Sequence, residues 1–194
     1  MKSVIYLLVL VVLTSCSIKI NSHDNEKRDF RTNLKVIKYK DTTSHFINNQ
    51  FVEIDAKDIA TISFKREKSI FYLLAPWCSP CVKKFVDYYP RLDSLSKKLN
   101  VPLYVFNNSY GFEKTIEKVY KKVKLQSPIY VLDNAVYNED IDINTSKFLH
   151  EICPDCTSNS NGWILILDKN SQVIYFINDL EDFSTINNGI NEKL

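Results

Sequence analysis

A strand pattern that runs straight into a cysteine pair and then a helical pattern constrains this chain most. The stretch from Ser69 to Ala75 is a continuous apolar run of strand length, typical of a strand buried on both faces of a sheet. After Pro-Trp-Cys-Ser-Pro-Cys at positions 76–81, the apolar period becomes that of a helix, from Val82 to Leu99. The sequence therefore predicts a β–α unit with a Cys-x-x-Cys pair at its junction.

The rest of the chain alternates strand and helix patterns. Further strands are predicted at residues 34–39, 51–54, 101–106, 128–132, 163–167 and 173–177. Helices are predicted at residues 82–99, 112–123 and 144–152, with a short one beyond residue 183. Residues 55–68 fit either pattern, and Pro90 is expected to kink or divide its helix. Together these patterns predict an α/β fold with a central mixed β-sheet flanked by helices.

The composition fits one globular domain and excludes several classes of protein. Apolar residues make up 45% of the 194 residues, and eleven Phe, eleven Tyr and two Trp are enough to build a core. A wholly disordered chain is therefore excluded. The Gly-rich phosphate-binding motifs are absent, so nothing indicates nucleotide chemistry. A net charge of +2 without a long basic run predicts no nucleic-acid partner, and the lysines within residues 114–122 are expected to form a solvated helix face.

The N-terminus has the pattern of a targeting signal. Val4 to Leu13 is a run of ten apolar residues, whereas a membrane-spanning helix needs about 20. The run fits the core of a secretory signal. It ends in Leu-Thr-Ser-Cys at positions 13–16, which resembles the bacterial lipobox, and this resemblance implies that Cys16 is lipidated after cleavage. An ordinary signal peptide with an incidental cysteine is the alternative, but the odd total of five Cys favours the lipoprotein.

These features divide the chain into three parts. Residues 1–15 are expected to be a lipoprotein signal peptide, 16–32 the lipidated N-terminus with a polar, flexible tether, and 33–194 the folded domain. The protein is expected in a bacterial cell envelope, anchored to a membrane by lipid, with its domain facing the periplasm or the cell surface. Ser17, which follows the lipidated position, favours the outer membrane.

A Cys-x-x-Cys pair at the start of a helix has a specific chemical use. Unpaired N–H groups and the helix dipole stabilise a thiolate there, and the pKa of the first thiol falls from about 8.5 into a range of about 3.5–7.5. The thiolate of Cys78 is then a nucleophile for disulfide exchange, and Cys81 is one helical turn away. Pro80 presets the backbone of the first turn.

Residues 75–81, Ala-Pro-Trp-Cys-Ser-Pro-Cys, with the strand before and the helix after, resemble the thioredoxin superfamily. The segment at 163–168 looks like that family's fourth core strand, and the resemblance covers roughly residues 50–180. It implies a thioredoxin-like fold in which Cys78 attacks, Cys81 resolves the mixed disulfide and Trp77 offers a flat contact surface. It implies protein disulfide or dithiol substrates, an unidentified redox partner and no bound cofactor. The residues expected to flank the site are Trp77, Ser79, Pro80 and Gly162.

Three positions depart from the family pattern. The family usually has a cis-proline just before its fourth strand, and Gly162 stands there. Many members bury a carboxylate six residues before the nucleophile, where this chain has Tyr72, a poor base at neutral pH. The helix proline usually falls at the position of Val86, but here it comes later, at Pro90. These departures leave a redox-inert, thioredoxin-like binding module as the alternative to an oxidoreductase.

A second Cys-x-x-Cys pair, Cys153 and Cys156, precedes Gly162. A local disulfide that staples the following polar loop is favoured, because no capped helix follows Cys156 to activate it. A dithiol that exchanges electrons with the first pair is the second possibility. The third is a zinc site, shared with the first pair or not. Residues 107–109 (Asn-Asn-Ser) end a strand and are expected to make a turn rather than a site.

Overall fold

The computed structural model describes residues 35–39, 50–64, 66–109, 111–125, 128–138, 140–157, 161–178 and 183–193. The predicted signal peptide, Cys16 with the tether, and the first two residues of the predicted domain lie outside the described residues.

Strands and helices alternate along the chain, as the sequence predicts. The strands are β1 (Lys35–Lys38), β2 (Gln50–Ile54), β3 (Lys68–Leu74), β4 (Leu103–Asn107), β5 (Ile129–Leu132), β6 (Trp163–Asp168) and β7 (Val173–Ile177). The helices are α3 (Ala56–Phe64), α4 (Ser79–Leu99), α5 (Glu113–Val123), α6 (Ile141–Ile152) and α7 (Phe183–Lys193).

The seven strands form one sheet in the order β1-β2-β5-β4-β3-β6-β7. Neighbouring strands from β1 to β3 in that order are parallel. The strand β6 pairs antiparallel with β3, and β7 pairs antiparallel with β6. The predicted mixed sheet with helices around it is therefore confirmed.

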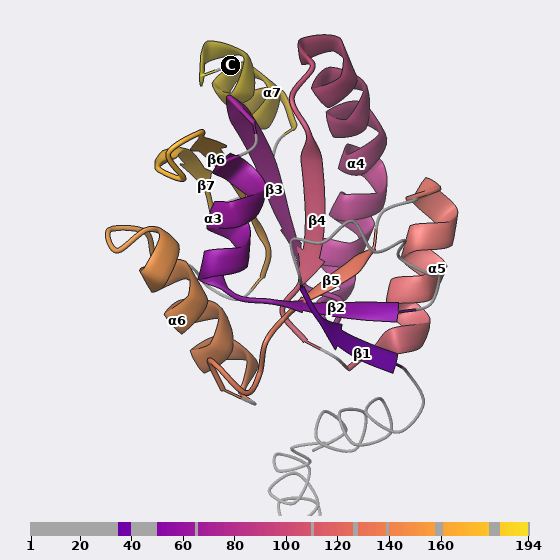
Figure 1. Ribbon diagram of the computed structural model, residues 1–194. Helices are drawn as coiled ribbons and strands as arrows, with labels where there is room; N and C mark the ends of the chain where they lie inside the picture. The colour runs from indigo at the N-terminus through magenta and orange to yellow at the C-terminus, as the bar shows by residue number, and fades with distance from the viewer. Residues whose placement is uncertain are drawn as a thin grey trace, which may run out of the picture.

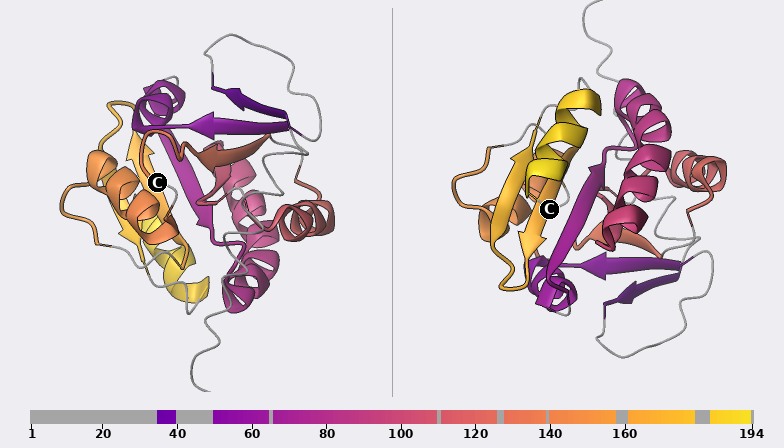
Figure 2. Two further views of the ribbon diagram at one scale, coloured as in Figure 1. Left: turned by 90° about the horizontal axis from the view of Figure 1, so that it is seen from below. Right: turned by 90° about the horizontal axis from the view of Figure 1, so that it is seen from above.

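Helices cover both faces of the sheet (Figures 1 and 2). One apolar core lies between the sheet and helices α4, α5 and α7, and we call it the α4-side core. The other lies between the sheet and helices α3 and α6, and we call it the α6-side core. Side chains of β3 alternate between the two: Ile70, Tyr72 and Leu74 enter the α4-side core, and Phe71 and Leu73 enter the α6-side core.

Local capping explains where two helices begin. The ambiguous stretch after residue 54 contains α3, and the Asp55 carboxylate accepts the backbone N–H groups of Lys57 and Asp58 at 2.8 and 2.9 Å. Helix α6 begins at Ile141, earlier than predicted, because Asp140 caps it by accepting two backbone N–H groups.

Pro90 does not divide α4, so that part of the sequence-based expectation is wrong. The helix runs unbroken over 21 residues. Phe85 and Tyr89 before the proline turn and Leu92 after it are all buried in the α4-side core. Packing on both sides of Pro90 therefore offsets the hydrogen bond that the proline removes.

Phe85 is the residue whose loss should weaken α4 packing most clearly. Its ring is fully buried and meets Tyr72 edge-on, with ring centroids 5.0 Å apart. We expect Phe85→Ala to lower the free energy of unfolding by about 3–5 kcal/mol, because it leaves a cavity in the core. Lys83→Ala, an exposed position on the same helix, is the control and should change it little. Urea denaturation followed by circular dichroism measures both, and a loss below about 1 kcal/mol for Phe85→Ala would contradict this packing.

Candidate functional site

The carboxyl ends of the parallel strands meet at one edge of the sheet, here called the carboxyl edge. Leu74 of β3 pairs with Asn107 of β4, and Asn107 pairs with Val131 of β5. Since β6 is antiparallel to β3, its first residue, Trp163, lies opposite Leu73 at the same edge. The carboxyl edge therefore gathers the residues that follow β3, β4 and β5 and those that precede β6.

The first cysteine pair is a disulfide at the start of α4. Cys78 and Cys81 are bonded, with Cα atoms 5.1 Å apart. Cys78 is the N-cap of the helix, and its Sγ accepts the backbone N–H of Cys81 at 3.3 Å. The same N–H is placed to donate to a Cys78 thiolate once the disulfide is reduced. Together with the positive end of a 21-residue helix, it favours the charged form of this sulfur.

The residues in and around this disulfide differ in their exposure to solvent. Cys78 and Cys81 are half-buried, while Ser79 and Pro80 are exposed. Trp77 is 36% exposed, unusually high for a large aromatic side chain, and it stands directly before Cys78. The half-buried disulfide therefore lies beside an exposed flat ring.

Gly162 lies level with the end of β3, because it immediately precedes the Trp163–Leu73 pair. It is buried and has a φ of 99°, a conformation that side chains with a Cβ rarely adopt. Proline holds φ near about −65°, so the backbone here differs from one built around proline. Gly162, which the sequence analysis singled out as a departure from the family pattern, therefore has a backbone conformation that favours glycine.

Tyr72 is unsuited to act as a proton acceptor for the cysteines. Its ring is 1% exposed and packs against Phe85 within the α4-side core. Burial, with a smaller contribution from Tyr88, raises the pKa of the Tyr72 hydroxyl well above its ordinary value of about 10. The phenol is therefore neutral near pH 7.

The second pair also forms a disulfide, between Cys153 and Cys156, with Cα atoms 5.2 Å apart. This disulfide lies at the C-terminus of a helix, whereas the first lies at a helix N-terminus. Cys153 is the C-cap of α6 and donates its N–H to the Leu149 carbonyl at 2.7 Å. Both cysteines pack against the α6-side core. The negative end of a helix dipole disfavours a thiolate, so the two disulfides occupy opposite electrostatic environments.

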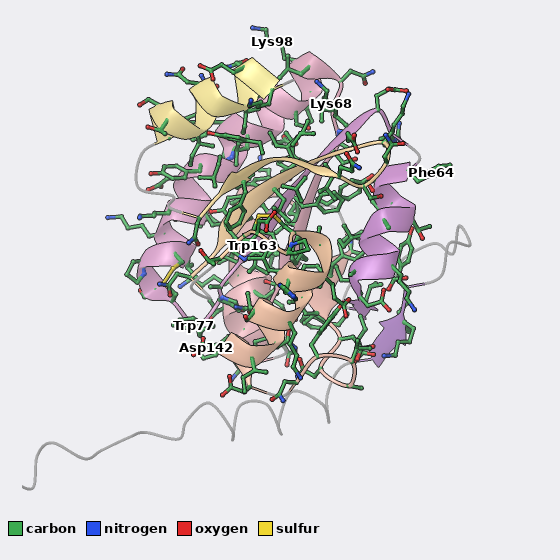
Figure 3. The ribbon with its side chains drawn as sticks, turned by 90° about the vertical axis from the view of Figure 1, so that its left-hand side faces the viewer. Phe64, Lys68, Trp77, Lys98, Asp142 and Trp163 are labelled. Atoms are coloured by element: carbon green, nitrogen blue, oxygen red, sulfur yellow. A yellow bond between two sulfur atoms is a disulfide. The ribbon has the colours of Figure 1, made fainter. Side chains whose placement is uncertain are left out.

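The two disulfides lie apart in Figure 3, one beside Trp77 and the other nearer Trp163. Each of the four sulfur atoms is bonded to its neighbour within its own pair. Among the described residues, no group of three or more His, Cys, Asp or Glu side chains has the arrangement of a metal site.

Residues 107–109 follow the expectation that they end a strand, since β4 ends at Asn107 and the chain bends at Asn108, and all three are also buried. Asn107 is in the sheet, and its amide donates to the Tyr120 hydroxyl of α5 at 3.2 Å. The Asn108 amide donates to the Thr145 hydroxyl of α6 at 3.2 Å. Since the two helices cover opposite faces of the sheet, the adjacent amides tie both faces to the end of β4. Their position directly after a buried strand was the available sequence signal.

A second buried amide contact fixes the start of α6. The Asn144 amide donates to the Asn134 side-chain oxygen at 2.7 Å and to the Asn138 carbonyl at 2.9 Å. Asn144 is fully buried within α6. These contacts hold the first turn of α6 against the loop after β5, at the carboxyl edge.

No protein-family model matches the chain, and no curated protein matches it significantly. None of the helices in the described part of the chain is both long and apolar enough to cross a membrane.

Because Cys78 lies at a helix N-terminus and Cys153 at a helix C-terminus, we expect the two pairs to differ in reactivity after reduction. At about pH 6.5 we expect Cys78 to alkylate at least about tenfold faster than Cys153 or Cys156, because only its thiol pKa is lowered by a helix N-terminus. Iodoacetamide labelling of the reduced protein, followed by peptide mass analysis, gives the four rates. Equal rates at Cys78 and Cys153 would contradict the electrostatic assignment.

Tyr72→Phe tests whether the buried hydroxyl takes part in proton transfer. Because the raised pKa keeps Tyr72 protonated between about pH 6 and 9, removing its hydroxyl should leave the pH profile of Cys78 alkylation unchanged. Ring packing against Phe85 is kept in this variant. A shift of the profile by about one pH unit or more would show that the hydroxyl influences the thiol.

Proposed function

We propose that this protein is a thiol–disulfide oxidoreductase of the thioredoxin-like superfamily, held by lipid in a bacterial cell envelope. The observation that carries the proposal is the Cys78–Cys81 disulfide at the N-terminus of α4, with a backbone N–H directed at the Cys78 sulfur. This placement supplies the electrostatic stabilisation that a nucleophilic thiolate needs. Trp77 beside it supplies an exposed surface on which a polypeptide can lie.

In the reducing direction the chemistry needs only the two cysteines and a substrate disulfide. The Cys78 thiolate attacks one substrate sulfur, forming a mixed disulfide and expelling the other substrate sulfur as a thiolate. The Cys81 thiolate then attacks the Cys78 sulfur, which releases the second substrate thiolate. The protein ends as the Cys78–Cys81 disulfide, having transferred two electrons, and the oxidising direction is the reverse of these steps.

The arrangement around β3 supports the thioredoxin-like part of the proposal. The resemblance implied a buried strand that leads into the cysteine pair, a helix after it and a hairpin that begins near the site. In the described residues β3 leads into α4, and the β6–β7 hairpin pairs antiparallel with β3. Gly162, in place of the family's proline, begins that hairpin at the carboxyl edge.

The envelope location and the lipid anchor rest on the sequence of residues 1–16. Two disulfides in one chain are consistent with that location, because disulfides persist in oxidising compartments. The favoured role of the Cys153–Cys156 disulfide is a staple at the end of α6, since it lacks an activating helix N-terminus.

A redox-inert binding module is the second candidate function. Two observations favour it: Tyr72 is a neutral phenol at the position of the family's carboxylate, and Gly162 replaces the proline. Such a module would keep Trp77 as a contact surface while its disulfide stayed closed.

The trapping of a mixed disulfide separates the two functions. We expect Cys81→Ala to accumulate disulfide-linked complexes with reducible protein substrates, because the Cys78 thiolate still attacks but no second thiol resolves the adduct. Cys78→Ala should form none, and a Cys153→Ala/Cys156→Ala double variant should behave as wild type. The reduced variant is incubated with disulfide-containing substrate proteins, and non-reducing electrophoresis detects the complexes. Absence of adducts with Cys81→Ala, in a chain whose fold is intact by circular dichroism, would favour the inert module.

A redox titration provides the direction of the reaction. Residues 17–194 contain every strand and helix described here, and this form is equilibrated in glutathione buffers of graded ratio. Family members span about −270 to −120 mV. A potential near the lower limit indicates a reductant, and one near the upper limit an oxidant. A Cys78–Cys81 disulfide that stays closed at every ratio would contradict the oxidoreductase.

A further inference from the structure

The end of the molecule opposite the disulfide carries a basic surface with an exposed aromatic side chain. We call this surface the basic pole. It consists of Phe64 with the basic residues Arg66, Lys68, Lys97, Lys98, Lys169 and Lys193. In Figure 3, Phe64, Lys68 and Lys98 lie on the other side of the molecule from Trp77 and Asp142.

Contacts between elements show that the basic pole is one surface. The Lys68 ammonium donates to the Lys193 carbonyl at 2.7 Å, which joins β3 to the end of α7. Lys169 lies 3.6 Å from the Glu67 carboxylate, which joins the β6–β7 turn to the segment before β3.

Two further contacts link other parts of the chain to this surface. The Ser63 hydroxyl lies 2.7 Å from the Ser171 hydroxyl, which joins the end of α3 to the β6–β7 turn. The Ile70 N–H donates to the Pro102 carbonyl at 2.9 Å, which places the α4–β4 connection beside β3.

Acidic residues at this surface are fewer and partly occupied. The acidic residues nearest to these six basic ones in the sequence are Glu67, Asp93, Asp168 and Glu192. The Asp93 carboxylate lies 2.6 Å from the Lys97 ammonium, so Lys98 on the same helix end carries the more available charge. One Asp168 oxygen already accepts the backbone N–H groups of Asn170 and Gln172, both at 2.9 Å. The carboxyl edge carries exposed charges of both signs, with Asp140 and Asp142 at the start of α6 and Lys83 near the start of α4.

Helix stability accounts for part of this charge but not for Phe64. Lysines in the last turns of α4 and α7 interact favourably with the helix dipoles. Phe64 is 76% exposed, the most exposed of the large apolar side chains described. An aromatic ring beside several ammonium groups is the combination found where proteins rest on an anionic membrane surface.

We propose that the basic pole is a docking surface for an anionic phospholipid bilayer, with Phe64 inserting among the headgroups and the lysines facing lipid phosphates. Docked in this way, the carboxyl edge and the Cys78–Cys81 disulfide point away from the bilayer. The proposal goes beyond the redox function and does not depend on the lipid anchor, since the folded domain supplies the whole surface.

The first test is vesicle co-sedimentation of residues 17–194 with Cys16 absent. We expect binding to vesicles of equal parts phosphatidylglycerol and phosphatidylcholine, and little binding to phosphatidylcholine alone. Lys97→Glu/Lys98→Glu should weaken the binding at least about tenfold, since each lysine near an anionic surface contributes about 1 kcal/mol. The matched control is Lys83→Glu/Lys84→Glu near the start of α4, which makes the same charge change at the opposite end of the same helix. Equal losses in the two double variants would overturn the proposal.

The second test places a reporter at each end of the molecule. Phe64→Trp should show a blue shift of its fluorescence, relative to wild type, when the anionic vesicles are added. Ile143→Trp, at a position 45% exposed near the carboxyl edge, should show none. No shift at position 64, or equally strong binding to the soluble polyanion heparin without any need for Phe64, would overturn the proposal in favour of a general polyanion surface. Neither result depends on Cys78 and Cys81, so both tests are independent of the redox function.

Discussion

The burial of β3 on both faces is the constraint on which the rest of this structure depends. Six of its seven residues are buried, and its apolar side chains alternate between two cores that involve each helix in the described part of the chain. A strand held by packing on both faces and by paired strands at both edges has one register and one end point. The turn at residues 75–78 and the first turn of α4 therefore have a fixed place, and the Cys78 sulfur is positioned by the core.

The two cysteine pairs show how position in the fold, rather than spacing, assigns chemistry. Both have two residues between the cysteines, and their Cα separations, 5.1 and 5.2 Å, are nearly the same. One sits where a helix begins and the other where a helix ends. A thiolate is favoured at the first position and disfavoured at the second. The same four-residue pattern therefore suits exchange at Cys78 and a durable crosslink at Cys153.

Local patterns predicted much of this fold, while non-local pairing decided the remainder. The β–α unit around Cys78 and the terminal hairpin follow from apolar period and turn residues, which act over a few positions. The insertion of β5 between β2 and β4 depends on pairing between distant segments, so no local pattern contains it. The hydrogen bonds of Asn107 and Asn108 were not predicted for the same reason, because their partners, Tyr120 and Thr145, come from helices on opposite faces.

Parallel strand order also separates the two surfaces to which we assign function. Each helix that follows a parallel strand starts at the carboxyl edge and returns toward the other end of the sheet. A site that uses a helix N-terminus, such as Cys78, must then lie at the carboxyl edge. Lysines that stabilise helix C-termini, such as Lys97 and Lys98, must lie at the far end. An exposed disulfide and a basic surface on opposite ends of one domain are thus two consequences of a single topology, and Phe64 is the feature that this topology does not require.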